Sequence, residues 1–247
     1  MAKITQKTIQ KSFDGAVDKY AGAVEDIGLW KSEEWVFTKY FGQGDQILDI
    51  GCGTGRTTFG LYERGFKNIT GLDYSPTLLS EAEKIKHKKG YEINFIEGDA
   101  MNLPFGDESF DQALFSFNGL MQIPQRKNRL KALKETLRVL KPGGYFIFTT
   151  HDRDQNENFL DFWEKEKKHW EQGEQDSRIY EYGDIIIEEG HGEHISFVHI
   201  PNRQEVEEDL REPGFTLVED FYREDHFTEY PHVQTFSAEC RFWVARK

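Results

Sequence analysis

The chain has 247 residues and a formal net charge of −13, from 31 Lys and Arg residues against 44 Asp and Glu residues. The acidic excess lies in residues 151–247, where 25 acidic residues stand against 11 basic ones, whereas residues 1–150 hold 19 and 20. Such a surface repels phosphate backbones, and no Lys- or Arg-rich stripe compensates for it, so a nucleic-acid partner is disfavoured.

Residues 1–44 are predicted to form a helical cap on the domain. Phe13, Ala16, Val17 and Tyr20 are spaced i, i+3, i+4 and i+7, which places them on one face of a helix. A second helical stretch, rich in aromatic residues, follows and ends at the glycines within residues 42–44.

Residues 45–151 alternate between strand-like and helix-like segments. Strands are expected at residues 47–50, 68–73, 93–97, 110–115 and 145–150, and helices at about 57–64, 76–88 and 126–140. Ser75 and Pro76 are typical of a helix start, and Pro142-Gly143-Gly144 should end the last of these helices. Strands separated by such helices predict a doubly wound, mostly parallel α/β sheet.

The pattern changes after residue 151. A charged helix is expected over residues 158–170, and two strand-like runs, 185–189 and 194–200, are joined by glycines in a way typical of a hairpin. A helix over 202–211 and strands over 215–222 and 237–245 follow. We therefore expect residues 152–200 to be a lid inserted between strands five and six, and residues 201–247 to complete a seven-stranded core sheet.

The run Ile47-Leu48-Asp49-Ile50-Gly51-Cys52-Gly53-Thr54-Gly55 predicts a buried strand that enters a glycine turn before a helix N-terminus. That arrangement suits the charged part of a nucleotide-like ligand. A dinucleotide fingerprint needs a third glycine where this chain has Arg56, and Asp49 would repel a pyrophosphate. An acid at this place suits an ammonium group instead.

Two further acids follow neighbouring strands. Asp73 ends the second strand and could accept hydrogen bonds from ribose hydroxyls, and Asp99 suits the exocyclic amine of adenine. A ligand with adenosine at one end and an amino acid at the other meets all these requirements. The cofactor predicted from the residues is S-adenosyl-L-methionine, in preference to NAD.

At these motifs the sequence resembles the class I S-adenosylmethionine-dependent methyltransferases, in the broad group that includes many small-molecule methyltransferases. The resemblance rests on residues 47–55, on Gly71-Leu72-Asp73-Tyr74-Ser75, on residues 98–105, and on residues 109–111 and 137–144. It implies a Rossmann-like methyltransferase fold. The cofactor-binding residues that the motifs indicate are Tyr20, Asp49, Gly51, Cys52, Gly53, Gly55, Arg56, Asp73, Tyr74, Asp99, Ala100, Met101, Ser116 and Phe117.

The resemblance also implies roles within this set. Asp49 would lie near the ammonium group, Tyr74 and Met101 would flank the adenine ring, and residues 116–118 would lie beside the sulfonium. Tyr20 is placed to reach the cofactor carboxylate. Arg56 could pair with the same carboxylate or be an exposed residue in the first turn of its helix.

No catalytic residue is required by the motifs, because the methyl group is already activated and the protein mainly aligns a nucleophile in line with the S–CH3 bond. His151, after the fifth strand, is the candidate general base, with His191, His194 and His199 as alternatives; for each, a surface or packing role is the more ordinary one. The spacing of these last three does not give one strand face, so no metal site is expected. Aromatic residues of the lid could line an acceptor pocket: Phe162, Trp163, Trp170, Tyr180 and Tyr182.

The predicted function is O- or N-methylation of a small-molecule acceptor by in-line methyl transfer. The alternatives are a tRNA methyltransferase of the same fold and a non-catalytic S-adenosylmethionine-binding protein. The acidic residues of 151–247 favour an amine-bearing acceptor. With no apolar run long enough to cross a membrane, no signal segment and only Cys52 and Cys240, we expect a cytoplasmic monomer or homodimer.

Overall fold

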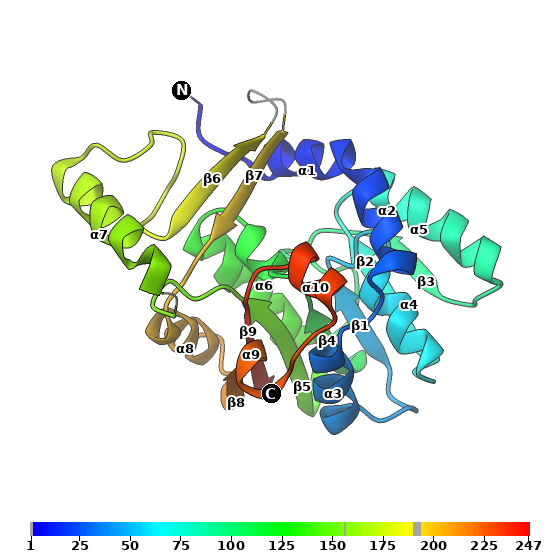
Figure 1. Ribbon diagram of the computed structural model, residues 1–247. Coiled ribbons are helices and arrows are strands. Elements are labelled where there is room, and N and C mark those ends of the chain that lie inside the picture. Colours follow the sequence, from blue (N-terminus) through cyan, green and yellow to red (C-terminus); the bar gives the residue numbers. More distant parts are fainter. Residues whose placement is uncertain (1, 156, 190–193) are drawn as a thin grey trace.

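The computed structural model describes residues 2–155, 157–189 and 194–247 (Figure 1). A seven-stranded sheet has the order β3-β2-β1-β4-β5-β9-β8, in which the pairs from β3 to β5 are parallel and β9 runs antiparallel to both of its neighbours. This confirms the predicted mostly parallel seven-stranded sheet. The strands are β1 Ile47–Ile50, β2 Ile69–Asp73, β3 Asn94–Glu97, β4 Phe110–Phe115, β5 Leu140–Thr150, β8 Thr216–Tyr222 and β9 Arg241–Arg246.

The sheet is buried on both faces because its side chains alternate between two apolar clusters. Leu48 and Ile50 of β1 pack on the face covered by α6 (Arg126–Val139) and α8 (Arg203–Arg211). Ile47 points to the opposite face, where α3 (Lys31–Tyr40) and α4 (Arg56–Glu63) pack. Helix α5 (Pro76–Lys89) packs against β2 and β3. The result is the three-layer arrangement expected when helices cover both faces of a parallel sheet.

The N-terminal helices lie at the edge of the sheet where the parallel strands end (Figure 1). Helix α1 (Gln6–Gly15) packs against β7 and α5, and α2 (Val17–Asp26) packs against α4 and α5. The two helices are separated at Ala16, whose backbone (φ −107°, ψ 16°) is not helical. The Thr54 hydroxyl donates a 2.8 Å hydrogen bond to the Tyr20 carbonyl, so α2 lies against the glycine turn that follows β1.

Residues of the predicted lid form α7 (Glu157–Gln172) and a separate antiparallel hairpin, β6 (Asp184–Glu189) with β7 (His194–His199). The hairpin pairs Asp184 with His199 and is not part of the main sheet. Residues 190–193, which include His191, lie outside the described residues. Backbone bonds tie the start of the chain to this segment, since Ile4 donates to the Arg178 carbonyl at 3.0 Å.

Two predicted boundaries were wrong. Strand β5 begins at Leu140 rather than at residue 145. Leu140 already pairs with Phe110 of β4, and the register shifts before Tyr145 pairs with Gln112. Gly144 makes this possible, since a Cβ there would lie 2.4 Å from the Asp111 carbonyl oxygen. The last strand begins at Arg241 rather than 237, after two short helices that were not predicted: α9 (Arg223–His226) and α10 (Pro231–Phe236).

Cys52 and Cys240 are buried free thiols. Within the three described ranges, no helix is both long and apolar enough to cross a membrane.

Candidate functional site

A cavity opens at the carboxyl ends of β1, β2 and β4, beneath α1 and α2. This is the position where ligands bind in open α/β sheets. Residues singled out from the sequence line it as follows: Tyr20, Asp49, Gly51, Cys52, Gly53, Arg56, Asp73, Tyr74, Ala100, Ser116 and Phe117.

Gly55, Asp99 and Met101 do not line this cavity. Gly55 takes φ +93° as the N-cap of α4, so its place is in the turn rather than in the cavity wall. The Asp99 carboxylate accepts a 2.8 Å hydrogen bond from the Met101 backbone N–H. Aspartates commonly cap turns with this contact. Contact of these three residues with a cofactor stays a prediction.

Asp49 lies in the cavity wall and is 1% exposed. The Thr58 hydroxyl donates a 2.6 Å hydrogen bond to its Oδ2. Burial raises the pKa of the Asp49 carboxyl to about 7, and this effect outweighs the Thr58 hydrogen bond and the charge of Arg56, which both lower it. A carboxyl in this state gains from a cationic ligand group, because a nearby ammonium favours its charged form.

Asp73 connects β2 to the glycine turn. Its Oδ2 accepts from the Gly53 backbone N–H at 2.8 Å and its Oδ1 accepts from the Ser75 N–H at 2.8 Å. Burial raises its pKa, while these backbone hydrogen bonds lower it in part. Each carboxylate oxygen keeps further acceptor capacity toward the cavity, as two ribose hydroxyls would require.

The glycine turn lets the backbone pass close to the sheet. Gly51 takes φ +66°, and a Cβ there would lie 2.4 Å from Cε2 of Phe115. Only glycine meets both requirements without strain. The ring of Phe115 itself lines the cavity.

Arg56 is not the exposed residue of one sequence-based alternative, because it is 8% exposed. Its two terminal nitrogens each donate a 2.6 Å bond to the Glu33 carboxylate, and its Nη1 also donates to the Gly28 carbonyl at 2.7 Å. Its guanidinium lies 4.8 Å from the ring centre of Trp30. Arg56 therefore ties α4 to α3 from the cavity wall, and its pairing with a cofactor carboxylate remains a prediction.

Several lining residues were not among the predicted ligand contacts. Phe236 of α10 stacks on Phe117 with a centroid distance of 5.0 Å, and Gln122 and Ile123 come from the short 3₁₀ helix η1 (Gly119–Gln122) and the residue after it. From α1 come Gln6, Ile9, Gln10 and Phe13. The prediction that Phe13 and Tyr20 share one face of a single helix was wrong, because the helix breaks at Ala16. Their rings nevertheless lie 5.5 Å apart across the break.

The structure does not place His151 as a general base. Its ring does not line the cavity, its Nδ1 bonds the Glu239 carbonyl at 2.8 Å, and its Nε2 bonds the Asn118 amide at 3.0 Å. Burial lowers the pKa of His151. Since Nδ1 must donate to a carbonyl, Nε2 is the acceptor for the Asn118 NH2 group. This histidine therefore holds Asn118 in place.

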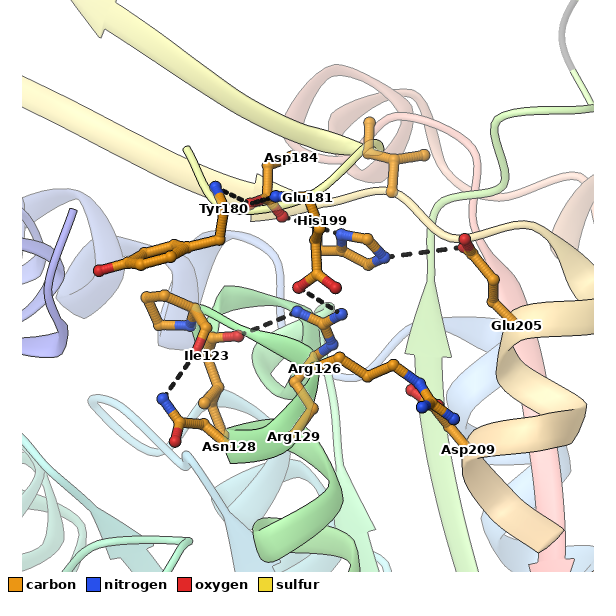
Figure 2. Close-up of polar contacts among 12 residues, drawn as sticks. Ile123, Arg126, Asn128, Arg129, Tyr180, Glu181, Asp184, His199, Glu205 and Asp209 are labelled. Atoms are coloured by element: carbon orange, nitrogen blue, oxygen red, sulfur yellow. Dashed lines mark hydrogen bonds and ion pairs between the residues drawn. The ribbon is translucent and has the colours of Figure 1, made fainter. Parts of the chain in front are cut away.

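His199 lies at the base of the hairpin, in a polar cluster with α6 and α8 (Figure 2). Its Nδ1 is 2.9 Å from Asp184 Oδ1 and its Nε2 is 3.7 Å from Glu205 Oε2. Glu181, three residues before Asp184 in the chain, accepts a 3.0 Å hydrogen bond from the buried Arg129. Ligand-type atoms of Glu181, Asp184 and His199 lie within 4.8 Å of one another, but each already has a protein partner. The cluster therefore anchors the hairpin; the side chains of His191 and His194 lie outside the described part of the chain.

The aromatic residues expected to line an acceptor pocket do not line this cavity: Phe162, Trp163, Trp170, Tyr180 and Tyr182. Trp163 is buried and packs against Tyr182, with 5.8 Å between ring centres. Phe162 is 40% exposed. The Tyr182 hydroxyl also donates to the Trp163 carbonyl at 3.1 Å, so this pair joins α7 to the residues just before the hairpin.

Comparison with known proteins agrees with the geometry. Residues 48–148 match the family described as a methyltransferase domain. The demethylmenaquinone methyltransferase of Staphylococcus epidermidis is 46% identical over 107 residues, which are 42% of this chain and 42% of that protein. The match to this relative thus spans less than half of its length.

Solved structures match over nearly the whole chain, at identities that show the fold alone. A SAM-dependent methyltransferase from Methanosarcina mazei has a TM-score of 0.69 at 22% identity, over 90% of this chain and 99% of that one. The 1,6-didemethyltoxoflavin N1-methyltransferase of Burkholderia thailandensis, solved with 1,6-didemethyltoxoflavin and S-adenosylhomocysteine, has a TM-score of 0.65 at 17% identity, over 98% of this chain and 88% of that chain.

The seven-stranded sheet with helices on both faces is the Rossmann-like methyltransferase fold. Residues 48–148 match the methyltransferase-domain family, in agreement with the resemblance that the sequence motifs indicated.

Proposed function

We propose that this chain binds S-adenosylmethionine in the cavity above β1, β2 and β4 and transfers its methyl group to an oxygen or nitrogen of a small molecule. One observation carries the proposal. A buried acid without a full counter-charge, Asp49, and an acid with spare acceptor capacity, Asp73, face the same cavity across the glycine turn. This pair matches an ammonium group and a ribose at opposite parts of one ligand.

The residues present fit that cofactor. Asp49 would hold the ammonium group, Asp73 the ribose hydroxyls, and Tyr74, which is 40% exposed, would cover the adenine together with Ala100. Ser116 and Phe117 would lie beside the sulfonium. The bound cofactor supplies an activated methyl group, so the protein has to align the acceptor and keep water out. Phe117, Phe236 and Phe13 provide the apolar walls for this.

The acceptor class follows less directly. The relatives named as demethylmenaquinone methyltransferases act by name on a small molecule, and the acidic composition of residues 151–247 disfavours RNA. The amine expected on the acceptor has no further support from the cavity, whose lining acids, Asp49 and Asp73, belong to the proposed cofactor site. A cytoplasmic location is proposed on the two free thiols alone.

The test is calorimetric titration with S-adenosylmethionine and S-adenosylhomocysteine. Asp73→Ala should weaken binding at least about tenfold, since it removes the ribose acceptor and loosens the turn. Asp26→Ala, which removes an exposed acid of α2, is the matched control and should bind like the wild type. Wild-type protein that fails to bind either compound would refute the proposal, as would unchanged binding by Asp73→Ala.

Methyl transfer is measured separately, with labelled cofactor and a panel of hydroxyl- and amine-bearing acceptors. Tight cofactor binding without transfer to any acceptor would favour the alternative of a non-catalytic cofactor-binding protein.

A further inference from the structure

A second chamber adjoins the cofactor cavity beneath α1. It lies between α1, the start of α2, η1 and β7, and Ile9, Phe13, Tyr20 and Gln122 belong to the walls of both spaces. The shared Gln122 lies on η1, just after the β4 end where the sulfonium is proposed to sit. The two spaces are therefore adjacent, and a molecule in the second chamber would lie next to a ligand in the first.

The charge of this chamber contrasts with that of the chain. Among the described residues that line it, Lys19 is the single charged one and none is a carboxylate. Lys19 is exposed, and within the described part of the chain its ammonium forms no hydrogen bond or ion pair. In a chain with an excess of 13 negative charges, the second chamber thus carries a positive charge.

The second chamber also lacks a base that could remove a proton from the acceptor. No histidine lines either space among the residues that the structure describes, and His151 is bound through both ring nitrogens. The acids Asp49 and Asp73 belong to the proposed cofactor site, so an ammonium acceptor in the second chamber would meet no group to take its proton and no carboxylate to hold its charge. An acidic hydroxyl ionises by itself, and its anion would be attracted by Lys19.

From these observations we propose that the second chamber binds the methyl acceptor and selects an apolar, ring-shaped molecule whose hydroxyl is ionised when it reacts. Ile9, Phe13, Ile195 and Phe197 supply apolar surface for the ring, and Lys19 lies at the side of the oxygen anion. The acceptor proton passes to solvent before the reaction. The oxygen anion then forms a bond to the methyl carbon while the S–C bond breaks, leaving its electron pair on sulfur to give a neutral thioether. This inference rests on the proposed function.

The test uses naphthalene probes of equal ring size and opposite charge. A nitronaphthol that is ionised at neutral pH and 2-(aminomethyl)naphthalene, which is cationic, are titrated into protein saturated with S-adenosylhomocysteine. The anion should bind at least tenfold more tightly than the cation. Lys19→Met should weaken the anion three- to tenfold and leave the cation unchanged or tighter, because the attraction between an exposed ammonium and an anion is modest.

Lys11→Met is the matched control, since Lys11 is an exposed lysine of α1 that lines neither space, and it should change neither affinity. Ile195→Ala should weaken both probes, which locates them against β7. Equal or tighter binding of the cation, binding of neither probe, or an anion affinity unaffected by Lys19→Met would overturn the inference. Cofactor affinity is measured on every variant first, so loss of the proposed function, seen as absent cofactor binding, is distinguished from a wrong acceptor class.

Discussion

Asp49 shows how strongly a single residue depends on its surroundings. Strand β1 is buried on both faces, so its one acid is 1% exposed, and burial raises its carboxyl pKa to about 7. In the free protein at pH 6 the carboxyl is therefore mainly protonated. A cofactor ammonium group favours the carboxylate and should pull the pKa back down on binding.

Cofactor affinity should consequently rise with pH. Between pH 6 and 8 the ionised fraction of Asp49 in the free protein grows about tenfold, and the affinity for S-adenosylhomocysteine should grow by a similar factor. Titrations in buffers of different ionisation enthalpy should show a proton released on binding at pH 6. Asp49→Asn, the isosteric control, should bind more weakly at pH 8 and lose this pH dependence. A wild-type affinity equal at the two pH values would contradict the proposed role of Asp49.

Gly51 and Gly28 offer a matched pair for separating backbone strain from steric conflict. Their φ angles are +66° and +63°, but a Cβ on Gly51 would lie 2.4 Å from Phe115 whereas one on Gly28 meets nothing within 4 Å. Gly28→Ala should lower the free energy of unfolding by about 1 kcal/mol through strain alone. Gly51→Ala should lower it by at least about 2 kcal/mol, since overpacking is added, and should also weaken cofactor binding. Chemical denaturation of both variants measures the difference, and equal losses would rule out the steric account.

At the scale of elements, the hairpin β6–β7 is not paired with the main sheet. Charged side chains connect it to α8 instead. Glu205 of α8 accepts 2.7 and 2.8 Å bonds from Arg153 and lies 3.7 Å from His199 of β7. Burial alone would raise the pKa of Glu205, but His199 and Arg153 outweigh it and lower the pKa to about 2. Glu205 therefore joins α8 to the segment after β5 through Arg153. It joins α8 to the hairpin through His199, as Figure 2 shows.

The sign of the resulting pH dependence follows from the lowered pKa. The stabilisation by the Glu205 carboxylate is complete above its ordinary pKa of 4.5 and is lost as the pH falls toward 2. The Glu205 side chain is 37% exposed, so water screens part of this effect. Glu205→Gln should thus reduce stability by only about 1 kcal/mol at pH 7, and its melting temperature should approach that of the wild type as the pH falls from 4 toward 2. Glu208→Gln, on the same helix, is the control and should have little effect. Thermal unfolding over this pH range measures both; a constant difference would exclude ionisation of Glu205 as the cause.

Local chemistry allowed most core elements to be predicted. Ser75 does cap α5, accepting from the Leu78 N–H at 3.0 Å, and the buried run before the glycine turn does form the central strand. What was missed depends on partners far away in the chain. Arg56 meets Glu33 only because α3 packs on α4, and Phe236 reaches the cavity from a helix 180 residues after β1. The Pro231 N1 signal for that helix was present and overlooked.

For the molecule as a whole, the net negative charge favours a small-molecule acceptor over tRNA. Residues 151–247 carry 14 more acidic than basic residues, and among the described residues they contribute Phe236 to the lining of the cofactor cavity. Phosphate backbones bind through released counterions, which a surface of this sign does not provide. Bulk tRNA should show no binding in filter or mobility assays at about 0.15 M salt, where surface attraction is screened beyond about 8 Å. Saturable tRNA binding under these conditions would revive the RNA methyltransferase alternative.

The contact between α1 and β7 has a consequence for how the chain is made. Ile4 and Ile9 are buried against Phe197, which follows them by almost 190 residues. While the chain emerges from the ribosome, the glycine turn and the parallel strands can form early, but the apolar side of α1 has no partner until the hairpin appears. Nascent chains in which β5 has been synthesised but β7 has not should therefore carry an exposed apolar helix at their N-terminus. We expect chaperones that bind exposed apolar surface to bind the chain most strongly at this stage.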